Sequence, residues 1–234
     1  MADIDYPCAD GPVPAYLAIP EGDGPWPGLV VLQDAMGFTT DLKRITDRFA
    51  AQGYLALAPA LYRRGARIRC IVSTFRSLSA GGGSAVAAIV AARDYLAADP
   101  RCTGKVGSVG FCMGGGFCLQ LAPLGVFDAT APNYGAGPRN KPDLSQSCPM
   151  VASYGARDVM LRGAARRVQA ELAAGDVPHD VKEYPGVGHS FMNDWDNPRA
   201  VQFVERIAGL SYSRPEAEDA WKRILAFFDQ HLKD

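Results

Sequence analysis

The clearest chemical pattern in the chain is GFCMGG at residues 110–115, in which Cys112 stands between glycines at minus two and plus two. The run before it, KVGSVGF at 105–111, predicts a strand, and residues 113–122 predict a helix. A G-x-C-x-G turn between a strand and a helix is typical of a nucleophile elbow, with cysteine where serine is usual. Such a turn projects the side chain above the sheet, and the helix N-terminus favours a thiolate. A small buried cysteine that only packs is the alternative interpretation.

A cysteine nucleophile needs a base, and the chain has only three histidines, His179, His189 and His231. His189 lies in the glycine-rich segment YPGVGHSF after a predicted strand, whereas the other two lie at predicted surface positions. Elbows of this kind are followed along the chain by an acid and then by the histidine. Asp158 comes directly after the predicted strand MVASY and is therefore the predicted orienter of His189. An aspartate at such a place can also simply cap a helix.

The elements that position these residues alternate along the chain. Short apolar runs followed by amphipathic stretches predict an α/β fold with a mostly parallel central sheet flanked by helices on both faces. Strands are predicted at 28–33, 54–58, 105–111, 150–154 and 179–184, and helices at 40–52, 84–98, 113–122, 163–174 and 215–232. Ser84 is the expected N-cap of its helix. No linker or repeat interrupts residues 1–234, which predicts a single domain.

The arginine- and glycine-rich segment from Tyr62 to Gly83 gives no clear secondary-structure prediction. A long irregular segment inside a compact domain often carries function. We therefore expect this segment to lie near a substrate.

Composition narrows the classes of partner. The 24 basic and 25 acidic residues nearly cancel, so no electrostatic footprint for nucleic acid or anionic lipid is present. The N-terminal residues lack a basic start followed by an apolar run, and we expect a soluble, cytoplasmic protein that does not bind membranes. The six cysteines form no CxxC pair and no zinc-ligand spacing with histidine, so we expect reduced thiols, no metal and no cofactor.

Four segments resemble the dienelactone hydrolase family over most of the chain: GFCMGG, QDAMG at 33–37, PALY at 59–62 and GVGHSFMND at 186–194. The resemblance implies an α/β-hydrolase fold, a Cys112–His189–Asp158 triad and hydrolysis of an unsaturated lactone carboxylate. Two backbone N–H groups are expected to form the oxyanion hole. One belongs to Met113, after the nucleophile, and the resemblance assigns the other to Ala35.

Two positions depart from the family pattern. Asp34 stands where the family has a glutamate that takes part in activating the cysteine, and it is one methylene shorter. It is a candidate for activation, with helix capping as the alternative. Asn193 stands four residues after His189, where the family has an arginine that binds the substrate carboxylate. Arg63, Arg64 and Arg76, in the Tyr62–Gly83 segment, are candidates to replace that arginine, and Arg76 is favoured by its loop position.

The sequence therefore predicts a cysteine-dependent hydrolase of a small-molecule ester or lactone that works through an acyl-enzyme. A broad-specificity carboxylesterase without dienelactone activity is the second hypothesis, and Asn193 favours it. A noncatalytic thiol or binding protein on the same fold is the third, since a fold alone does not imply chemistry. The oligomeric state and the physiological substrate are not predicted.

Overall fold

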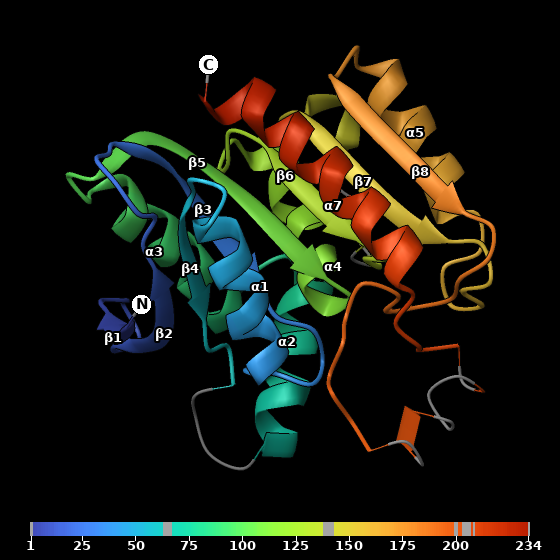
Figure 1. Cartoon of the computed structure of the whole chain (residues 1–234), viewed down its shortest axis with the longest axis horizontal. Coiled ribbons are helices and arrows are strands. Elements are labelled where there is room, and N and C mark those ends of the chain that lie inside the picture. Colours follow the sequence, from blue (N-terminus) through green and yellow to red (C-terminus); the bar gives the residue numbers. More distant parts are fainter. Residues whose placement is uncertain are drawn as a thin grey trace.

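The protein is built around one eight-stranded sheet (Figure 1). The computed structural model describes residues 2–62, 67–137, 143–198, 201–202, 207 and 209–233. The strands lie in the order β1-β2-β4-β3-β5-β6-β7-β8 across the sheet. Their bounds are β1 Ala2–Tyr6, β2 Val13–Ala18, β3 Trp26–Leu32, β4 Leu55–Pro59, β5 Cys102–Phe111, β6 Thr130–Asn133, β7 Met150–Gly155 and β8 His179–Tyr184.

The direction of the strands decides where a site can form. β1 and β2 pair antiparallel, as do β2 and β4, and every other pair in the sheet is parallel. The carboxyl ends of β3, β5, β6, β7 and β8 therefore meet at one edge. The predicted site residues follow these ends directly, and this edge is where ligands bind in open α/β sheets.

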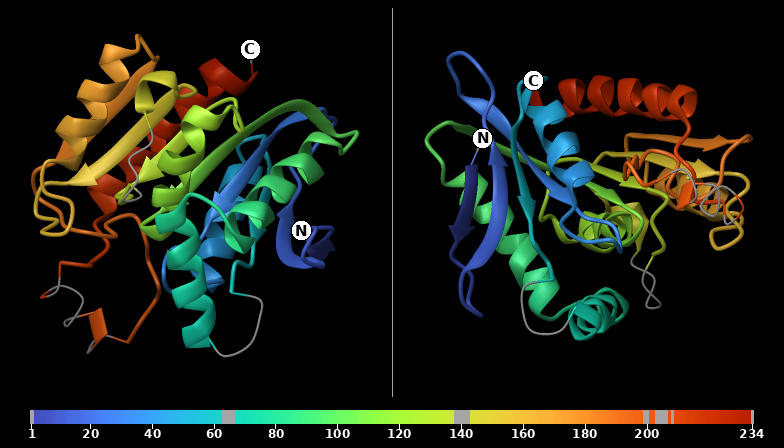
Figure 2. Two further views of the ribbon diagram at one scale, coloured as in Figure 1. Left: turned by 180° about the vertical axis from the view of Figure 1, so that it is seen from behind. Right: turned by 60° about the horizontal axis from the view of Figure 1, so that its bottom comes forward.

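Helices cover both faces of the sheet. α1 (Thr40–Ala50) and α7 (Arg214–Phe228) lie on one face, and α3 (Ser84–Ala97), α4 (Met113–Leu121) and α5 (Ala164–Ala174) lie on the other (Figures 1 and 2). α2 (Arg67–Ala80) packs against α3 and α4. β3 is apolar along its whole length because helices cover both of its faces.

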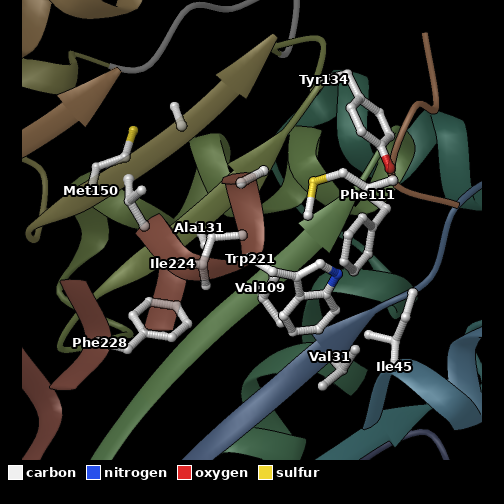
Figure 3. Packing of buried hydrophobic residues seen from close by; sticks show 14 of the residues in the cluster. Val31, Ile45, Val109, Phe111, Ala131, Tyr134, Met150, Trp221, Ile224 and Phe228 are labelled. Atoms are coloured by element: carbon white, nitrogen blue, oxygen red, sulfur yellow. The ribbon is translucent and has the colours of Figure 1, made fainter. Parts of the chain in front are cut away.

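The face covered by α1 and α7 is held together by aromatic and branched side chains from both helices and the sheet (Figure 3). Trp221 of α7 is 3% exposed, and its ring lies 4.6 Å from the ring of Phe49 on α1. The guanidinium of Arg48 stacks 4.2 Å from the same indole and forms a two-bond ion pair with Glu218. This cluster fixes α1, and with it the loop between β3 and α1.

The predicted α/β architecture is confirmed, but some of its elements were missed or misread. β1, β2 and β6 were not predicted, and the central strand β6 contains Pro132, which argues against a strand in a sequence. The expected N-cap Ser84 is instead the first residue of α3, capped by Gly83 at a φ of 99°. The last predicted helix divides into α7 and a π-helical turn over Asp229–Lys233.

The segment from Tyr62 to Gly83 is not irregular throughout, because most of it forms α2. The buried side of α2 carries Cys70, Thr74, Ser77 and Leu78, at helical spacing. Three of these four residues are small and weakly polar, so the apolar periodicity that identifies a helix is faint. Arg63 and Arg64 lie outside the described residues.

Among the described residues, no single helix is long and apolar enough to cross a membrane. Two consecutive helices, Ile68–Ala80 and Ser84–Ala97, reach the length and apolar composition of a membrane span only when taken together, and the chain bends by 79° between them.

Replacement of Trp221 by alanine tests the α1–α7 packing. We expect Trp221→Ala to lower the free energy of unfolding by about 3–5 kcal/mol, because a large buried aromatic side chain leaves a cavity. Urea titration followed by far-UV circular dichroism measures this loss. The control is Leu124→Ala, at a side chain that is 62% exposed, which we expect to stay within about 0.5 kcal/mol of the wild type. Equal losses in the two variants would contradict the packing argument.

Candidate active site

Cys112 occupies a strained turn between β5 and α4. Its φ of 53° and ψ of −111° are unusual for a residue with a side chain, and such conformations persist only where the surroundings fix them. The N–H of Cys112 donates to the carbonyl oxygen of Asn133 at the end of β6 (3.1 Å). The thiol is partly exposed at the start of α4.

Glycines around Cys112 let main chain pack on main chain. A Cβ atom on Gly110 would lie 2.2 Å from the carbonyl oxygen of Gly114, and one on Gly114 would lie 2.4 Å from that of Leu32. These are distances that real Cβ atoms do not adopt. The two glycines at minus two and plus two of the predicted elbow are therefore required by the fold.

His189 and Asp158 form a buried pair above the sheet. Nδ1 of His189 lies 2.6 Å from Oδ2 of Asp158, and the two residues are 7% and 3% exposed. The N–H of Met160 donates to the other carboxylate oxygen of Asp158 (2.9 Å), which fixes the carboxylate plane. This bond leaves Nε2 of His189 as the nitrogen that can act on Cys112, and Nε2 is buried without a hydrogen-bond partner in the resting geometry.

Opposing influences set the proton affinity of His189. Burial is the largest, and it lowers the pKa by disfavouring the imidazolium. The hydrogen bond to Asp158 and the nearby Cys112 thiol outweigh burial and raise the pKa of His189 to about 9. Cys112 therefore lies near enough to influence the charge of His189, and a proton transfer between them requires the contact to tighten.

Ala35 and Met113, the residues predicted for the oxyanion hole, lie close together. The hydroxyl of Tyr62 donates to the carbonyl oxygen of Ala35 (3.2 Å) and lies 3.6 Å from the sulfur of Met113. The first turn of α4 also packs on the end of β3, since a Cβ atom on Gly114 would lie 2.4 Å from the carbonyl oxygen of Leu32. Their role in binding an oxyanion stays a prediction.

Asp34 is buried at 5% exposure and turned toward the loop after His189. Its Oδ2 accepts from the indole N–H of Trp195 (2.9 Å), and its Oδ1 accepts from the N–H of Met36 (2.7 Å). Burial, the largest influence, raises the pKa of Asp34 above its ordinary value despite these hydrogen bonds. The carboxyl group therefore has an elevated proton affinity near the site.

Asn193 lies inside the protein, with both ends of its amide in use. It is 5% exposed, accepts from the hydroxyl of Tyr134 (2.6 Å) and donates to Oδ2 of Asp41 on α1 (3.0 Å). An amide held on both sides is not free to turn toward a substrate. Arg76 is an exposed residue of α2, and no described contact brings it to Cys112.

Comparison with known proteins places this geometry in a family. The model of the dienelactone hydrolase family matches residues 13–232. The chain belongs to this family. The prediction of an α/β-hydrolase fold is confirmed, and so is the prediction that the protein is a dienelactone hydrolase-like hydrolase.

Relatives of the dienelactone hydrolase family cover nearly the whole chain. A protein of Synechocystis named "Putative carboxymethylenebutenolidase" is 29% identical over 94% of this chain and 93% of its own length. One of the same name from Methylorubrum extorquens is 30% identical over 98% of this chain and 80% of its own. The crystal structure named "Putative Dienelactone Hydrolase" from Klebsiella pneumoniae shares 27% identity, covers 98% of both chains and has a TM-score of 0.77.

The remaining histidines of this dienelactone hydrolase family member lie apart from the elbow. Nδ1 of His179 lies 2.7 Å from the carbonyl oxygen of Val177 at the start of β8, and His231 packs on Phe227 in the π-helical turn. Among the described residues, no group of three or more His, Cys, Asp and Glu side chains is placed to hold a metal ion. The absence of a metal and of a cofactor from the chemistry stays a prediction.

Tyr134 and Asp41 were not among the predicted site residues; Tyr134 contacts His189, and Asp41 binds Asn193. Tyr134 follows β6, a strand that its proline concealed, and Asp41 reads as an ordinary first-turn acid of α1. A tyrosine directly after the carboxyl end of a central strand would have been the signal, had that strand been recognised.

The raised pKa of His189 predicts a pH dependence of stability. The folded value of about 9 exceeds the ordinary 6.5, so the stabilisation is fully present below about pH 6.5 and is lost as the pH rises through 9. Asp158→Asn removes the carboxylate that favours the imidazolium. We therefore expect the wild type to lose more unfolding free energy than Asp158→Asn between pH 6.5 and 9, measured by urea titration. Parallel curves for the two proteins would show that the pair does not raise the pKa.

Proposed function

We propose that this protein hydrolyses a small ester or lactone with Cys112 as nucleophile, His189 as base and Asp158 as the residue that orients the base. The observation that carries the proposal is the buried 2.6 Å contact between His189 and Asp158, beside a cysteine in a strained elbow. A merely structural cysteine needs neither the strained turn nor an oriented imidazole.

The first half of the reaction forms an acyl-enzyme. His189 takes the thiol proton while the sulfur of Cys112 bonds to the substrate carbonyl carbon, whose π electrons move to the oxygen. The N–H groups of Ala35 and Met113 stabilise this oxyanion. When the carbonyl re-forms, the ester C–O bond breaks and the leaving oxygen takes the proton from His189. A lactone opens here and keeps its alcohol tethered to the acyl group.

The second half hydrolyses the thioester. His189 removes a proton from water as the water oxygen bonds to the thioester carbon, and the C–S bond then breaks. The proton returns to the sulfur of Cys112, and the carboxylic acid product leaves. Asp158 holds the imidazole in the tautomer with Nε2 free throughout the cycle. A thioester is readily hydrolysed, which favours esters and lactones over amides as substrates.

The choice of substrate within this class turns on charge. Two relatives carry the name "Putative carboxymethylenebutenolidase", and a carboxymethylenebutenolide is a lactone that bears a carboxylate. Here the amide of Asn193 is committed to Tyr134 and Asp41, and the carboxyl groups of Asp34 and Asp41 are buried nearby. Burying an anion beside these acids is unfavourable. These contacts support a broad-specificity esterase as the second candidate.

Replacement of the triad residues tests the mechanism. We expect Cys112→Ala to abolish turnover, and His189→Ala to lower kcat by roughly three to five orders of magnitude, with the fold intact. Hydrolysis of an activated phenyl ester, followed spectrophotometrically, measures both. His179→Ala is the matched histidine control, and its kcat should stay within about two-fold of the wild type. Wild-type activity in folded Cys112→Ala would exclude the thiol mechanism.

Substrate charge tests the choice between the two candidates. We expect kcat/KM for a lactone carboxylate to be no more than about 100-fold, or about 2.7 kcal/mol, above that for its methyl ester. The reason is that the neutral amide of Asn193 replaces a charged guanidinium.

A larger preference for the free acid would mean that another cation binds the carboxylate. Loss of that preference in Arg76→Ala would then identify the cation as Arg76.

A further inference from the structure

A three-residue segment at the end of β6, Asn133–Gly135, contacts the surroundings of all three proposed triad residues; we call it the β6 tail. The carbonyl oxygen of Asn133 accepts from the N–H of Cys112 (3.1 Å). The N–H of Tyr134 donates to the carbonyl oxygen of Ser153 (2.7 Å), on the strand that leads to Asp158. A Cβ atom on Gly135 would lie 2.3 Å from the carbonyl carbon of Gly115, so the β6 tail also presses on the first turn of α4.

The side chain of Tyr134 completes the contact with the base. Its ring centroid lies 5.2 Å from that of His189, at an interplanar angle of 63°. It is fully buried, at 0% exposure, beside Phe111 (Figure 3). Its φ of 39° is a conformation that a tyrosine adopts only where the surroundings hold it. Because Tyr134 has no exposed surface, it reaches the reaction only through His189.

A chain of hydrogen bonds fixes the far end of this ring. The hydroxyl of Tyr134 donates to Oδ1 of Asn193 (2.6 Å), and Nδ2 of Asn193 donates to Oδ2 of Asp41 (3.0 Å). Asp41 is in turn paired with Arg44 (2.8 Å). Burial, the main cause, keeps the pKa of Tyr134 well above its usual range, so the hydroxyl stays a donor. Each group in the chain thus has one orientation.

We propose that Tyr134 is a positioning residue for His189, and that Asn193 and Asp41 hold its ring in place. This inference rests on the proposed function, because it assigns a role to Tyr134 relative to the catalytic base. Asn193 then belongs to the internal support of the base.

The geometry explains why a second support is needed. The contact with Asp158 fixes Nδ1 of His189, but the imidazole can still swing about the line that joins the two residues. The Tyr134 ring, 5.2 Å from the imidazole, limits that swing on one side. Nε2 then stays on the side of Cys112. Misplacement of a catalytic group by about 1 Å can cost up to about 100-fold in rate.

Removal of a single oxygen atom tests the proposal. We expect Tyr134→Phe to lower kcat for the activated ester by about 10-fold while KM changes by less than about two-fold, because the defect lies in the base and not in substrate binding. Alkylation of Cys112 by iodoacetamide at pH 7, followed by peptide mass spectrometry, gives a readout that needs no turnover. Its rate should also fall, because a displaced imidazole accepts the thiol proton less readily and iodoacetamide reacts with the thiolate.

Tyr184→Phe is the matched control. Tyr184 is also buried, its ring lies 5.1 Å from Phe191 in the loop that carries His189, and its hydroxyl donates to Asp219. We expect this variant to keep kcat and the alkylation rate within about two-fold of the wild type. Equal losses in Tyr134→Phe and Tyr184→Phe would overturn the proposal in favour of a general packing effect.

Asn193→Ala tests the hydrogen-bond chain itself. This variant should also lower kcat. The double variant with Tyr134→Phe should be no slower than the slower single variant, because both substitutions remove the same hydrogen bond. If Tyr134→Phe fails to fold, Asn193→Ala alone must lower kcat with KM unchanged. An unchanged kcat, or a rise in KM alone, would overturn the proposal. Failure of the triad itself is recognised separately, by activity in Cys112→Ala.

Discussion

Main chain packs directly on main chain where the first turn of α4 meets the ends of β3 and β6. Gly110, Gly114, Gly115 and Gly135 have no Cβ at the contact points, and a methyl group at any of them would meet backbone atoms within 2.7 Å. Backbone atoms have no rotamers to adjust, so this contact leaves Cys112 one position. The position of Cys112 at the edge of the sheet is therefore fixed, and the loops after β3, β7 and β8 lie around it.

The carboxyl groups at the site fall into two groups that differ in their partners. Asp158 pairs with His189 and favours its protonated form, whereas Asp34 and Asp41 are buried with neutral or externally paired partners. Burial raises the pKa of both of these carboxyl groups. Burial disfavours the charged form of each carboxyl group, and hydrogen bonds from Trp195 and Asn193 keep it oriented.

Much of the scaffold could be predicted from local pattern. Residues 28–33 and 150–154 are continuous apolar runs, and the periodic stripe of α1 contains Leu42, Ile45 and Phe49, all of which are buried. Two of the elements that were not predicted contain residues unusual for their structure. Pro132 argues against a strand at β6, and the weakly polar buried side of α2 lacks the apolar periodicity of a helix. In both places tertiary packing determines the secondary structure, and a local sequence pattern carries no information about that packing.

The candidate site divides in the same way. Motif spacing pointed to Cys112, Asp158 and His189, because an elbow and two loops after strands are local features. It could not identify Tyr134, whose relevance arises from a contact across 55 residues of chain, or the inward orientation of Asn193, which depends on α1. Short motifs report what the chain does over a few residues, whereas support for a catalytic base comes from elements that meet only after folding.

The short side chain of Asn193 ends inside the protein, at 5% exposure, and finds its hydrogen-bond partners there. Tyr134 and Asp41 supply these partners, one acceptor site and one donor site being used on the amide. The amide thereby forms a neutral bridge between α1 and the β6 tail. Under the proposed role of Tyr134, loss of this bridge would loosen the base without changing how the substrate binds.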